Sequence, residues 1–229
     1  MAGSVVVTGA AGALGRAVVA EFSQRGDPVV ALDVAGAALD AVAELASGAA
    51  VHPVAADLAS RDAVAAAWKQ VDELGPPRAL VALAGGFAGA KLVDLDEATL
   101  EDMMQSNFVS ALWCCQAAAQ RITAAGGGAI VTVGSRTAVA GTGPVAHATS
   151  KAAVVRLTEV LAEDLKRSGV RVNTVLPSVI DTPANRSWMS ADLAERAVEP
   201  EAIARVIAFL CSDDAWLISG ARIPVYGQA

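Results

Sequence analysis

The sequence predicts a single α/β domain built on a doubly wound parallel sheet. Three observations support this prediction. Short valine-rich runs alternate with alanine-rich helical segments along the whole chain. The runs are continuously apolar, which indicates strands that are buried on both faces. The 229 residues suffice for one such domain, and no linker or low-complexity segment separates a second one. We therefore expect residues 1–229 to form one domain of about seven strands, with helices on both faces of the sheet.

The individual elements follow from this alternation in chain order. Each expected strand is a short run rich in β-branched residues, and each expected helix begins where an alanine-rich stretch follows a turn. Right-handed crossovers between parallel strands then place the helices on both faces of the sheet. The expected strands span residues 4–8, 28–33, 50–56, 79–84, 129–134, 170–176 and 222–225. The expected helices begin near Gly12, Ala35, Ser60, Asp96, Val145, Ala184 and Glu199.

Composition argues against several classes of function. A formal net charge of −7 is unlike that of nucleic-acid-binding proteins, which normally carry a basic patch. The sequence contains no run of 18 or more apolar residues, so we expect no membrane span. The N-terminus leaves no room for a signal peptide. Cys114, Cys115 and Cys211 lack metal-ligand spacing, and we expect buried thiols. We therefore expect a cytoplasmic protein with no nucleic-acid partner, no membrane association and no metal site.

A glycine-rich turn connects the first expected strand to the first expected helix. Glycines allow the backbone to approach a pyrophosphate closely, and the N-terminus of a helix favours the negative charge of that group. The alternative interpretation is a plain connection between a strand and a helix. The residues that we expect to contact a dinucleotide here are Gly9, Ala11, Gly12, Leu14 and Gly15.

Aspartates follow the next two strands. Asp33 can accept hydrogen bonds from ribose hydroxyls and repel a 2′-phosphate, which favours NAD(H) and makes NADP(H) a poorer fit. A basic residue that could bind that phosphate is absent from two nearby positions, which are occupied by Gly12 and Val34. Asp57 and its neighbour Leu58 follow the third strand. The alternative for each aspartate is a cap for the next helix, and for Asp33 the two roles are compatible.

A serine, a histidine and a lysine occur at a spacing that suggests one site. Ser135 ends the fifth apolar run, so its hydroxyl would point into the crevice at the carboxyl ends of the strands. His147 and Lys151 are four residues apart and therefore share one helical face. Asn107 lies among apolar residues of another expected helix, where a polar side chain needs partners. A surface position is the alternative for Asn107.

Taken together, these motifs resemble the short-chain dehydrogenase/reductase family, whose members have a Rossmann-type fold. The resemblance covers the whole chain, with six motifs in the family's order on the expected elements. Residues 8–15 match Thr-Gly-x-x-x-Gly-x-Gly except at Ala13, which replaces the middle glycine. The other matched positions are Ala84 and Gly85 of the family's Asn-Asn-Ala-Gly, whose two asparagines are missing here, and Pro177, Ile180 and Thr182 of Pro-Gly-x-x-x-Thr, where Ser178 replaces the glycine.

The resemblance implies hydride transfer between a nicotinamide cofactor and an alcohol or carbonyl substrate. In the family the serine binds the substrate oxygen, the tyrosine transfers the proton and the lysine binds the nicotinamide ribose. The helix asparagine holds a water of the proton relay. These positions are Ser135, His147, Lys151 and Asn107, so a histidine stands where the family has tyrosine. The chain's one tyrosine, Tyr226, lies three residues from the C-terminus.

The family pattern also implies roles for the remaining matched positions. Asp57 and Leu58 would contact adenine, and Ala84 with Gly85 would form a flat wall beside adenosine. The backbone at Ile180 would bind the carboxamide. Pro177 begins that last motif, and Thr182 would face the pyrophosphate or the carboxamide.

The histidine leaves more than one function open. Imidazole exchanges protons near pH 7, so we expect His147 as a substitute acid/base whose pKa the Lys151 cation lowers. A second hypothesis is a cofactor-binding but catalytically silent relative with a scaffold or sensing role, and a third is lyase or isomerase chemistry. The family also implies a dimer or tetramer. Residues 87–92 and 185–189 suggest a mostly apolar pocket for a small-molecule carbonyl or alcohol, whose identity the sequence leaves open.

Overall fold

The strands of this protein form one parallel sheet. We describe residues 3–228 in a computed structural model. The strand order is β3-β2-β1-β4-β5-β6-β7, so the chain reverses its direction of winding between β1 and β4. All neighbouring strands in this sheet run parallel. The bounds are β1 Ser4–Thr8, β2 Val29–Asp33, β3 Val51–Ala55, β4 Pro77–Ala82, β5 Gly128–Val133, β6 Val170–Pro177 and β7 Arg222–Val225.

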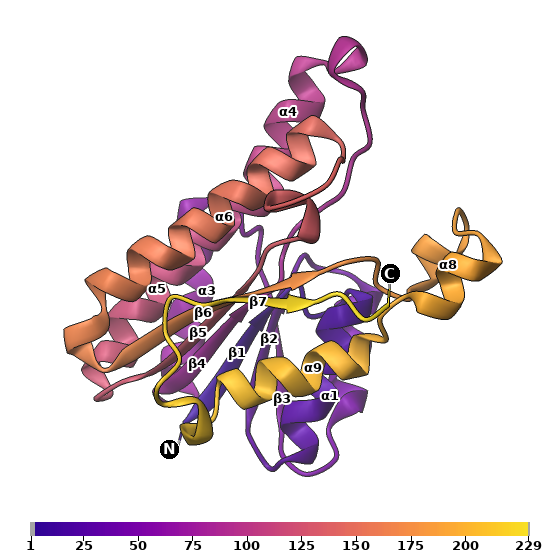
Figure 1. The fold of residues 1–229 in the computed structure, drawn as a ribbon. Helices are drawn as coiled ribbons and strands as arrows, with labels where there is room; N and C mark the ends of the chain where they lie inside the picture. Colours follow the sequence, from indigo (N-terminus) through magenta and orange to yellow (C-terminus); the bar gives the residue numbers. More distant parts are fainter. Residues whose placement is uncertain (1–2, 229) are drawn as a thin grey trace.

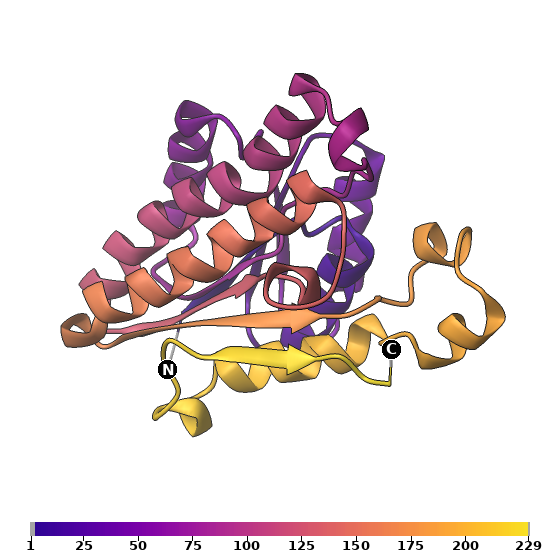
Figure 2. The ribbon, with the colours of Figure 1, turned by 45° about the horizontal axis from the view of Figure 1, so that its top comes forward.

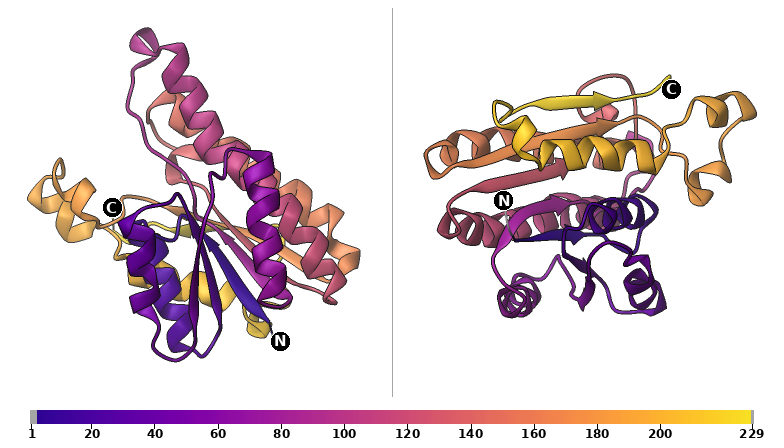
Figure 3. Two further views of the ribbon diagram at one scale, coloured as in Figure 1. Left: turned by 180° about the vertical axis from the view of Figure 1, so that it is seen from behind. Right: turned by 90° about the horizontal axis from the view of Figure 1, so that it is seen from below.

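Helices cover both faces of the sheet (Figures 1 and 3). Helices α1 (Ala13–Gln24) and α9 (Pro200–Leu210) pack side by side on one face. The other face carries α3 (Arg61–Glu73), α5 (Ser110–Ala124) and α6 (Val145–Asp164). The shorter helices are α2 Ala37–Asp40, α4 Glu97–Met103, α7 Pro183–Arg186 and α8 Ala191–Arg196. The chain also contains the 3₁₀ turns η1 Ala41–Leu45, η2 Leu92–Asp94, η4 Arg136–Ala138, η5 Lys166–Ser168 and η6 Asp213–Ala215, and the π-helical turn η3 Met104–Val109.

Apolar periodicity explains how these helices pack, and α3 is a clear example. The Ser60 hydroxyl accepts a hydrogen bond from the Ala63 backbone N–H and caps the helix. Apolar residues three and four positions apart then form one buried stripe against the sheet. The buried residues of this stripe are Val64, Ala67, Trp68 and Val71.

The expected strands and helix starts are confirmed, with ends that move by one or two residues. Strand β4 ends at Ala82 instead of residue 84 because the backbone N–H groups of Leu83 and Ala84 turn to the Thr8 hydroxyl. The helix expected from Asp96 contains the π-helical turn η3 between α4 and α5. Residues 191–196 form an additional short helix, α8.

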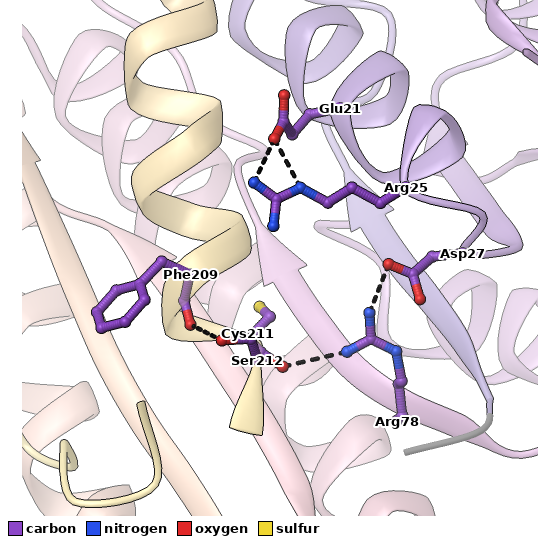
Figure 4. Close-up of polar contacts among 7 residues, drawn as sticks. All are labelled: Glu21, Arg25, Asp27, Arg78, Phe209, Cys211 and Ser212. Atoms are coloured by element: carbon purple, nitrogen blue, oxygen red, sulfur yellow. Dashed lines mark hydrogen bonds and ion pairs between the residues drawn. The ribbon is translucent and has the colours of Figure 1, made fainter. Parts of the chain in front are cut away.

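Polar contacts close the amino-terminal end of the sheet (Figure 4). The Arg78 guanidinium pairs with the Asp27 carboxylate at 2.7 Å and donates to the Cys211 carbonyl at 3.1 Å. These contacts connect the start of β4 to the loop after α1 and to the end of α9. Beside them, Arg25 and Glu21 form an ion pair at the end of α1. This end of the sheet is therefore occupied by contacts that stabilise the fold.

The opposite end of the sheet carries a projecting segment. Figure 2 shows α7 and α8 extending past the carboxyl end of β6. A bridge between Ile180 and Val198 holds the base of this segment, with a 2.8 Å hydrogen bond from the Asp181 N–H to the Val198 carbonyl. No helix in the described part of the chain is long and apolar enough to span a bilayer.

Candidate active site

A cavity of about 1160 Å³ opens at the carboxyl ends of the strands, where the sheet changes its direction of winding. This is the place where doubly wound sheets bind ligands. Every site residue expected from the sequence lines the cavity except Asn107. The lining residues expected at the nucleotide end are Gly9, Ala11, Gly12, Leu14, Gly15, Asp33, Asp57, Leu58, Ala84 and Gly85. Those expected at the reacting end are Ser135, His147, Lys151, Pro177, Ile180 and Thr182.

The glycine turn is so tight that side chains at two of its positions, Gly9 and Gly15, would clash with the backbone. Gly9 has a φ of 65°, and a Cβ there would lie 2.8 Å from the Ala84 backbone nitrogen. A Cβ on Gly15 would lie 2.0 Å from the Gly9 carbonyl oxygen. Ala13 is the first residue of α1, and an alanine fits that ordinary helical position. Helix α1 has no side-chain cap and no acid in its first turn, so its N-terminus fits an anionic group such as a pyrophosphate.

Asp33 and Asp57 accept hydrogen bonds from backbone N–H groups of nearby loops and do not cap helices. The Asp33 carboxylate accepts hydrogen bonds from the Ala11 N–H at 2.9 Å and from the Val34 N–H at 2.8 Å. Helix α2 begins only at Ala37, without a side-chain cap, and Ser60 caps α3. Asp57 instead accepts from the N–H of Ala59 at 3.0 Å. The capping alternative is therefore wrong for both residues.

The turn after β4 is braced by a threonine hydroxyl. Thr8 Oγ1 accepts hydrogen bonds from the Leu83 and Ala84 N–H groups, both at 3.1 Å. In the family pattern an asparagine of this turn braces the central strands, and this chain has none there. Thr8 therefore connects β1 to the turn, and its position directly before the glycines was the available sequence signal.

Asn107 is buried, which makes the surface alternative wrong. It lies in the π-helical turn and has 1% of its surface exposed. Its Oδ1 accepts from the Gly86 N–H at 3.0 Å, while Nδ2 donates to the Gly86 carbonyl at 3.2 Å and to Ser150 Oγ at 3.0 Å. A Cβ on Gly85 would lie 2.4 Å from Asn107 Oδ1. Asn107 thus fixes the loop after β4 against α6, behind the cavity wall.

Lys151 is a buried cation at the reacting end. Its side chain reaches across to β5, where Nζ donates to the Val133 carbonyl at 3.0 Å. Burial lowers the pKa of Lys151 to about 8. The ammonium form therefore still predominates at neutral pH, but the group titrates within the range of ordinary assays.

His147 lies one helical turn before Lys151 and is also buried. Its ring meets the Phe87 ring edge-on, with centroids 5.0 Å apart, and its Nδ1 atom is enclosed without a hydrogen-bond partner. Burial first, and then the charge of Lys151, lower the pKa of His147 to about 4. The expected direction of the shift and the contribution of Lys151 are confirmed, and burial, which the sequence analysis did not include, is the larger cause.

Ser135 has a partner that the sequence reasoning missed. Ser135 Oγ lies 2.9 Å from Thr137 Oγ1 and accepts from the Thr137 N–H at 3.2 Å. Both residues line the cavity beside His147. A hydroxyl two positions after the serine is the local pattern of a serine turn, and this signal was available in the sequence.

The loop after β6 is organised by its own polar groups. Thr182 Oγ1 accepts from the Asn185 N–H at 3.1 Å and caps α7, while Asn185 Nδ2 donates to the Ile180 carbonyl at 2.8 Å. Ser178, in the place of a glycine, donates its hydroxyl to the Tyr226 carbonyl at 2.7 Å. The serine thus ties this loop to the residue after β7.

The rim of the cavity agrees in part with the sequence expectation. Phe87, Asn185 and Trp188 line it, whereas residues 88–92 do not. That loop rises away from the cavity, and Leu92 and Val93 are exposed. Within residues 3–228, no group of three His, Cys, Asp or Glu side chains is placed to hold a metal ion. Further lining residues that were not expected include Asp102, Gln105, Ser106, Ser110, Thr142, Gly143, Pro144, Val179 and Pro183.

Comparisons with known proteins agree with this geometry. A family model described as short chain dehydrogenase matches residues 4–193. The chain belongs to the short-chain dehydrogenase/reductase family. Cis-4-hydroxycyclohexanecarboxylate dehydrogenase of Sinomonas cyclohexanicum is 36% identical over 234 residues, covering 97% of this chain and 94% of that protein. D-xylose 1-dehydrogenase of Caulobacter vibrioides is 30% identical over 228 residues, covering 94% and 91%.

Solved structures of the family share the fold. An oxidoreductase from Burkholderia thailandensis superimposes with a TM-score of 0.90 at 34% identity, covering 99% of this chain and 92% of that one. L-sorbose reductase from Gluconobacter frateurii gives a TM-score of 0.91 at 24% identity, covering 99% and 96%. The chain is therefore an oxidoreductase of this family, whose members use a nicotinamide cofactor on alcohols and carbonyls.

Proposed function

We propose that the protein is an NAD(H)-dependent oxidoreductase that interconverts an alcohol and a carbonyl, and that all 229 residues form one cofactor-binding domain. One observation carries this proposal. Ser135, His147 and Lys151 line the same cavity as the glycine turn and Asp33. A dinucleotide lying along that cavity would bring its nicotinamide end to the three side chains that can bind and protonate a substrate oxygen.

Each residue then has a definite role. The bound cofactor supplies or accepts a hydride at nicotinamide C4. The N-terminus of α1 and the backbone of Gly9, Ala11 and Gly12 would hold the pyrophosphate, and Leu14 and Gly15 would let the chain pass close to it. The adenosine would lie between Asp33, Asp57 and Leu58 on one side and Ala84 with Gly85 on the other.

At the reacting end, protein groups orient the substrate and move its proton. The Ser135 hydroxyl and the His147 imidazole would hydrogen-bond the substrate oxygen, and Lys151 would bind the nicotinamide ribose. Pro177, Ile180 and Thr182 would flank the carboxamide and the pyrophosphate. Asn107 acts through Gly86 and Ser150 and is therefore a positioning residue.

NAD(H) is the cofactor that the charges favour. The Asp33 carboxylate lies on the glycine turn, where it would repel a 2′-phosphate. Among the described residues that line the cavity, Lys151 is the one cation, and it lies at the other end. The fold alone does not decide the cofactor, since L-sorbose reductase of the same fold was solved with NADPH.

A neutral substrate fits the reacting end best. The charged side chains that line the described cavity are Asp33, Asp57, Asp102 and Lys151, so no arginine is available for a substrate carboxylate. Phe87, Pro144 and Trp188 supply apolar surface instead. We therefore propose a neutral, largely apolar ketone or alcohol, in contrast to the 4-hydroxycyclohexanecarboxylate named for one relative.

A matched pair of ketones tests both parts of this proposal. With NADH, cyclohexanone should be reduced with a kcat/KM at least tenfold above that of 4-oxocyclohexanecarboxylate, which adds only a carboxylate. Equal rates would contradict the neutral-substrate proposal. Tight NADH binding without turnover on a broad carbonyl panel would contradict hydride transfer and support the silent relative.

The thiols of the protein bear on its cellular compartment, and the outward faces of two helices bear on its assembly. Cys114, Cys115 and Cys211 are free and buried, and burial raises the pKa of each thiol, so they are unreactive. We propose a reducing, cytoplasmic setting on this basis. We also propose a dimer or tetramer that packs through the outward faces of α5 and α6, where Ala153 and the exposed Val160 offer apolar contact.

A further inference from the structure

His147 presents its two ring nitrogens to very different surroundings. Nδ1 is enclosed by protein and has no hydrogen-bond partner. His147 nevertheless lines the cavity, so Nε2 is the ring nitrogen through which it can meet a substrate. A neutral imidazole carries its proton on one of these nitrogens and a lone pair on the other.

The enclosed nitrogen decides where that proton resides. A buried N–H without an acceptor is among the rarest groups in folded proteins, and leaving a donor unsatisfied costs about 1–3 kcal/mol. A proton on Nδ1, or a charged ring, would place such a donor in the enclosed position. A proton on Nε2 leaves only a lone pair there and directs the N–H into the cavity.

The surroundings also disfavour the charged ring. Phe87 covers His147 with the edge-on contact described above, and Lys151 places a like charge one turn along α6. On the other elements around the cavity, the charged side chains are Asp33, Asp57 and Asp102. Asp33 and Asp57 follow β2 and β3 at the nucleotide end, and none of the three carboxylates accepts a hydrogen bond from the imidazole. A pKa of about 4 agrees with this arrangement.

We infer that His147 works as the neutral imidazole protonated on Nε2, donating a hydrogen bond to the substrate oxygen, and that Lys151 supplies the proton that completes carbonyl reduction. This inference rests on the proposed function and deepens it. His147 is then a catalytic residue that holds developing negative charge, as donors of an oxyanion hole do. It does not replace the family tyrosine as an acid.

The atoms of the reaction balance on this assignment. Once the carbonyl carbon has accepted a hydride from the reduced nicotinamide, its oxygen carries an electron pair as an alkoxide. The Nε2–H of His147 and the hydroxyl of Ser135 stabilise that charge without breaking their own bonds. The alkoxide then takes a proton that originates on the Lys151 ammonium and passes through water, and solvent reprotonates the neutral amine.

The tautomer can be measured without any turnover. The chain has only two histidines, so ¹H–¹⁵N correlation spectra of the uniformly labelled, cofactor-free protein resolve both rings. A His52→Gln variant assigns the signals of His147. We expect the Nε2-protonated pattern to persist unchanged from pH 8 to pH 5.5. A proton on Nδ1, or conversion to imidazolium in this range, would overturn the inference.

Kinetics distinguish a hydrogen-bond donor from an acid. In His147→Gln the side-chain amide nitrogen reaches the position of Nε2, whereas His147→Asn places it near Nδ1. We expect the glutamine variant to keep carbonyl reduction within about tenfold and the asparagine variant to lose about 10²–10³-fold, the effect of removing one oxyanion donor. Equal loss in both variants contradicts the inference.

The pH profile identifies the group that donates the proton. Reduction by wild type and by His147→Gln should fall as pH rises through the pKa of Lys151, because the ammonium donor is lost. A wild-type profile that falls instead with ionisation of His147, and flattens in the glutamine variant, would overturn the assignment to Lys151. Failure of every carbonyl to react would refute the proposed function, while the spectra would still decide the tautomer.

Discussion

At the scale of single residues, two side chains carry the chemistry proposed for the site. His147 stands where the family has tyrosine, and burial together with the charge of Lys151 lowers its pKa to about 4. Asp33 directs a carboxylate onto the glycine turn. The proposed role of His147 depends on its staying uncharged, which a pH titration tests. The proposed role of Asp33 depends on its negative charge, which the choice between NAD(H) and NADP(H) tests.

The first residue-scale prediction concerns the cofactor. NAD(H) should bind at least about tenfold tighter than NADP(H), a difference of about 1.4 kcal/mol, because Asp33 repels the additional phosphate. Asp33→Ala should narrow that ratio in calorimetric titrations. Asp57→Ala, which removes a carboxylate without facing the 2′ position, should weaken both cofactors alike. Tighter binding of NADP(H) by the wild type would contradict the role of Asp33.

The second residue-scale prediction concerns stability and pH. The pKa of His147 falls from 6.5 to about 4 on folding. Between these two pH values, the imidazole therefore binds a proton in the unfolded chain but not in the folded chain. The contribution of His147 to stability is therefore intact above pH 6.5 and decreases as pH falls toward 4, and solvent screening keeps this loss below about 3 kcal/mol. His147→Gln should flatten the loss between pH 6.5 and 5 in urea titrations. A slope shared by both proteins would show that other groups cause it.

At the scale of elements, the site depends on connections that join neighbouring segments across the cavity. Thr8 joins β1 to the turn after β4, and Asn107 joins the π-helical turn to Gly86 and Ser150. These contacts hold the walls of the nucleotide end at fixed positions. The glycine turn fits between them only because Gly9 and Gly15 have no side chains.

The element-scale prediction tests the threonine brace. Thr8→Val keeps the shape of the side chain but leaves the Leu83 and Ala84 N–H groups without their acceptor. The expected loss is about 1–3 kcal/mol of unfolding free energy, together with weaker cofactor binding. Thr8→Ser keeps the hydroxyl and should lie close to wild type in urea unfolding. If valine and serine variants are equally stable, the hydroxyl is not the brace.

At the scale of the whole molecule, the two ends of the sheet differ in structure and in proposed function. The amino-terminal end is closed by Arg78, Asp27 and the Cys211 carbonyl, while the carboxyl end opens as the cavity. Helices α5 and α6 lie side by side on one face of the sheet (Figure 1). On α6, Val160 is an exposed apolar side chain, and the assembly proposed above would bury it against a second copy of the chain.

The molecular-scale prediction concerns this assembly. Light scattering at micromolar concentration should give at least twice the mass of one chain. Val160→Asp, on the outward face of α6, should shift the protein toward the monomer. Val34→Asp, which places the same charge at an exposed site after β2, should not. A wild-type monomer would refute the proposed assembly.

The sequence alone determined the fold and many of the positions that line the site. Buried parallel strands read as continuous apolar runs, and the residues that follow such strands must meet at one edge of the sheet. For this reason Ser135, Asp33 and the glycine turn could be placed in one crevice before their contacts were known. Local spacing likewise put His147 and Lys151 on one helical face.

Only the tertiary structure decided how those residues behave. The partners of Thr8 and Asn107 lie in segments that are distant in sequence, so a local pattern can mark these two residues but not the groups that they contact. The lowered pKa of His147 is caused chiefly by burial, and the enclosure of its Nδ1 is likewise a product of packing. Burial and hydrogen bonding shift an ionisation only after packing has fixed which atoms exclude water, and sequence spacing carries no measure of that exclusion.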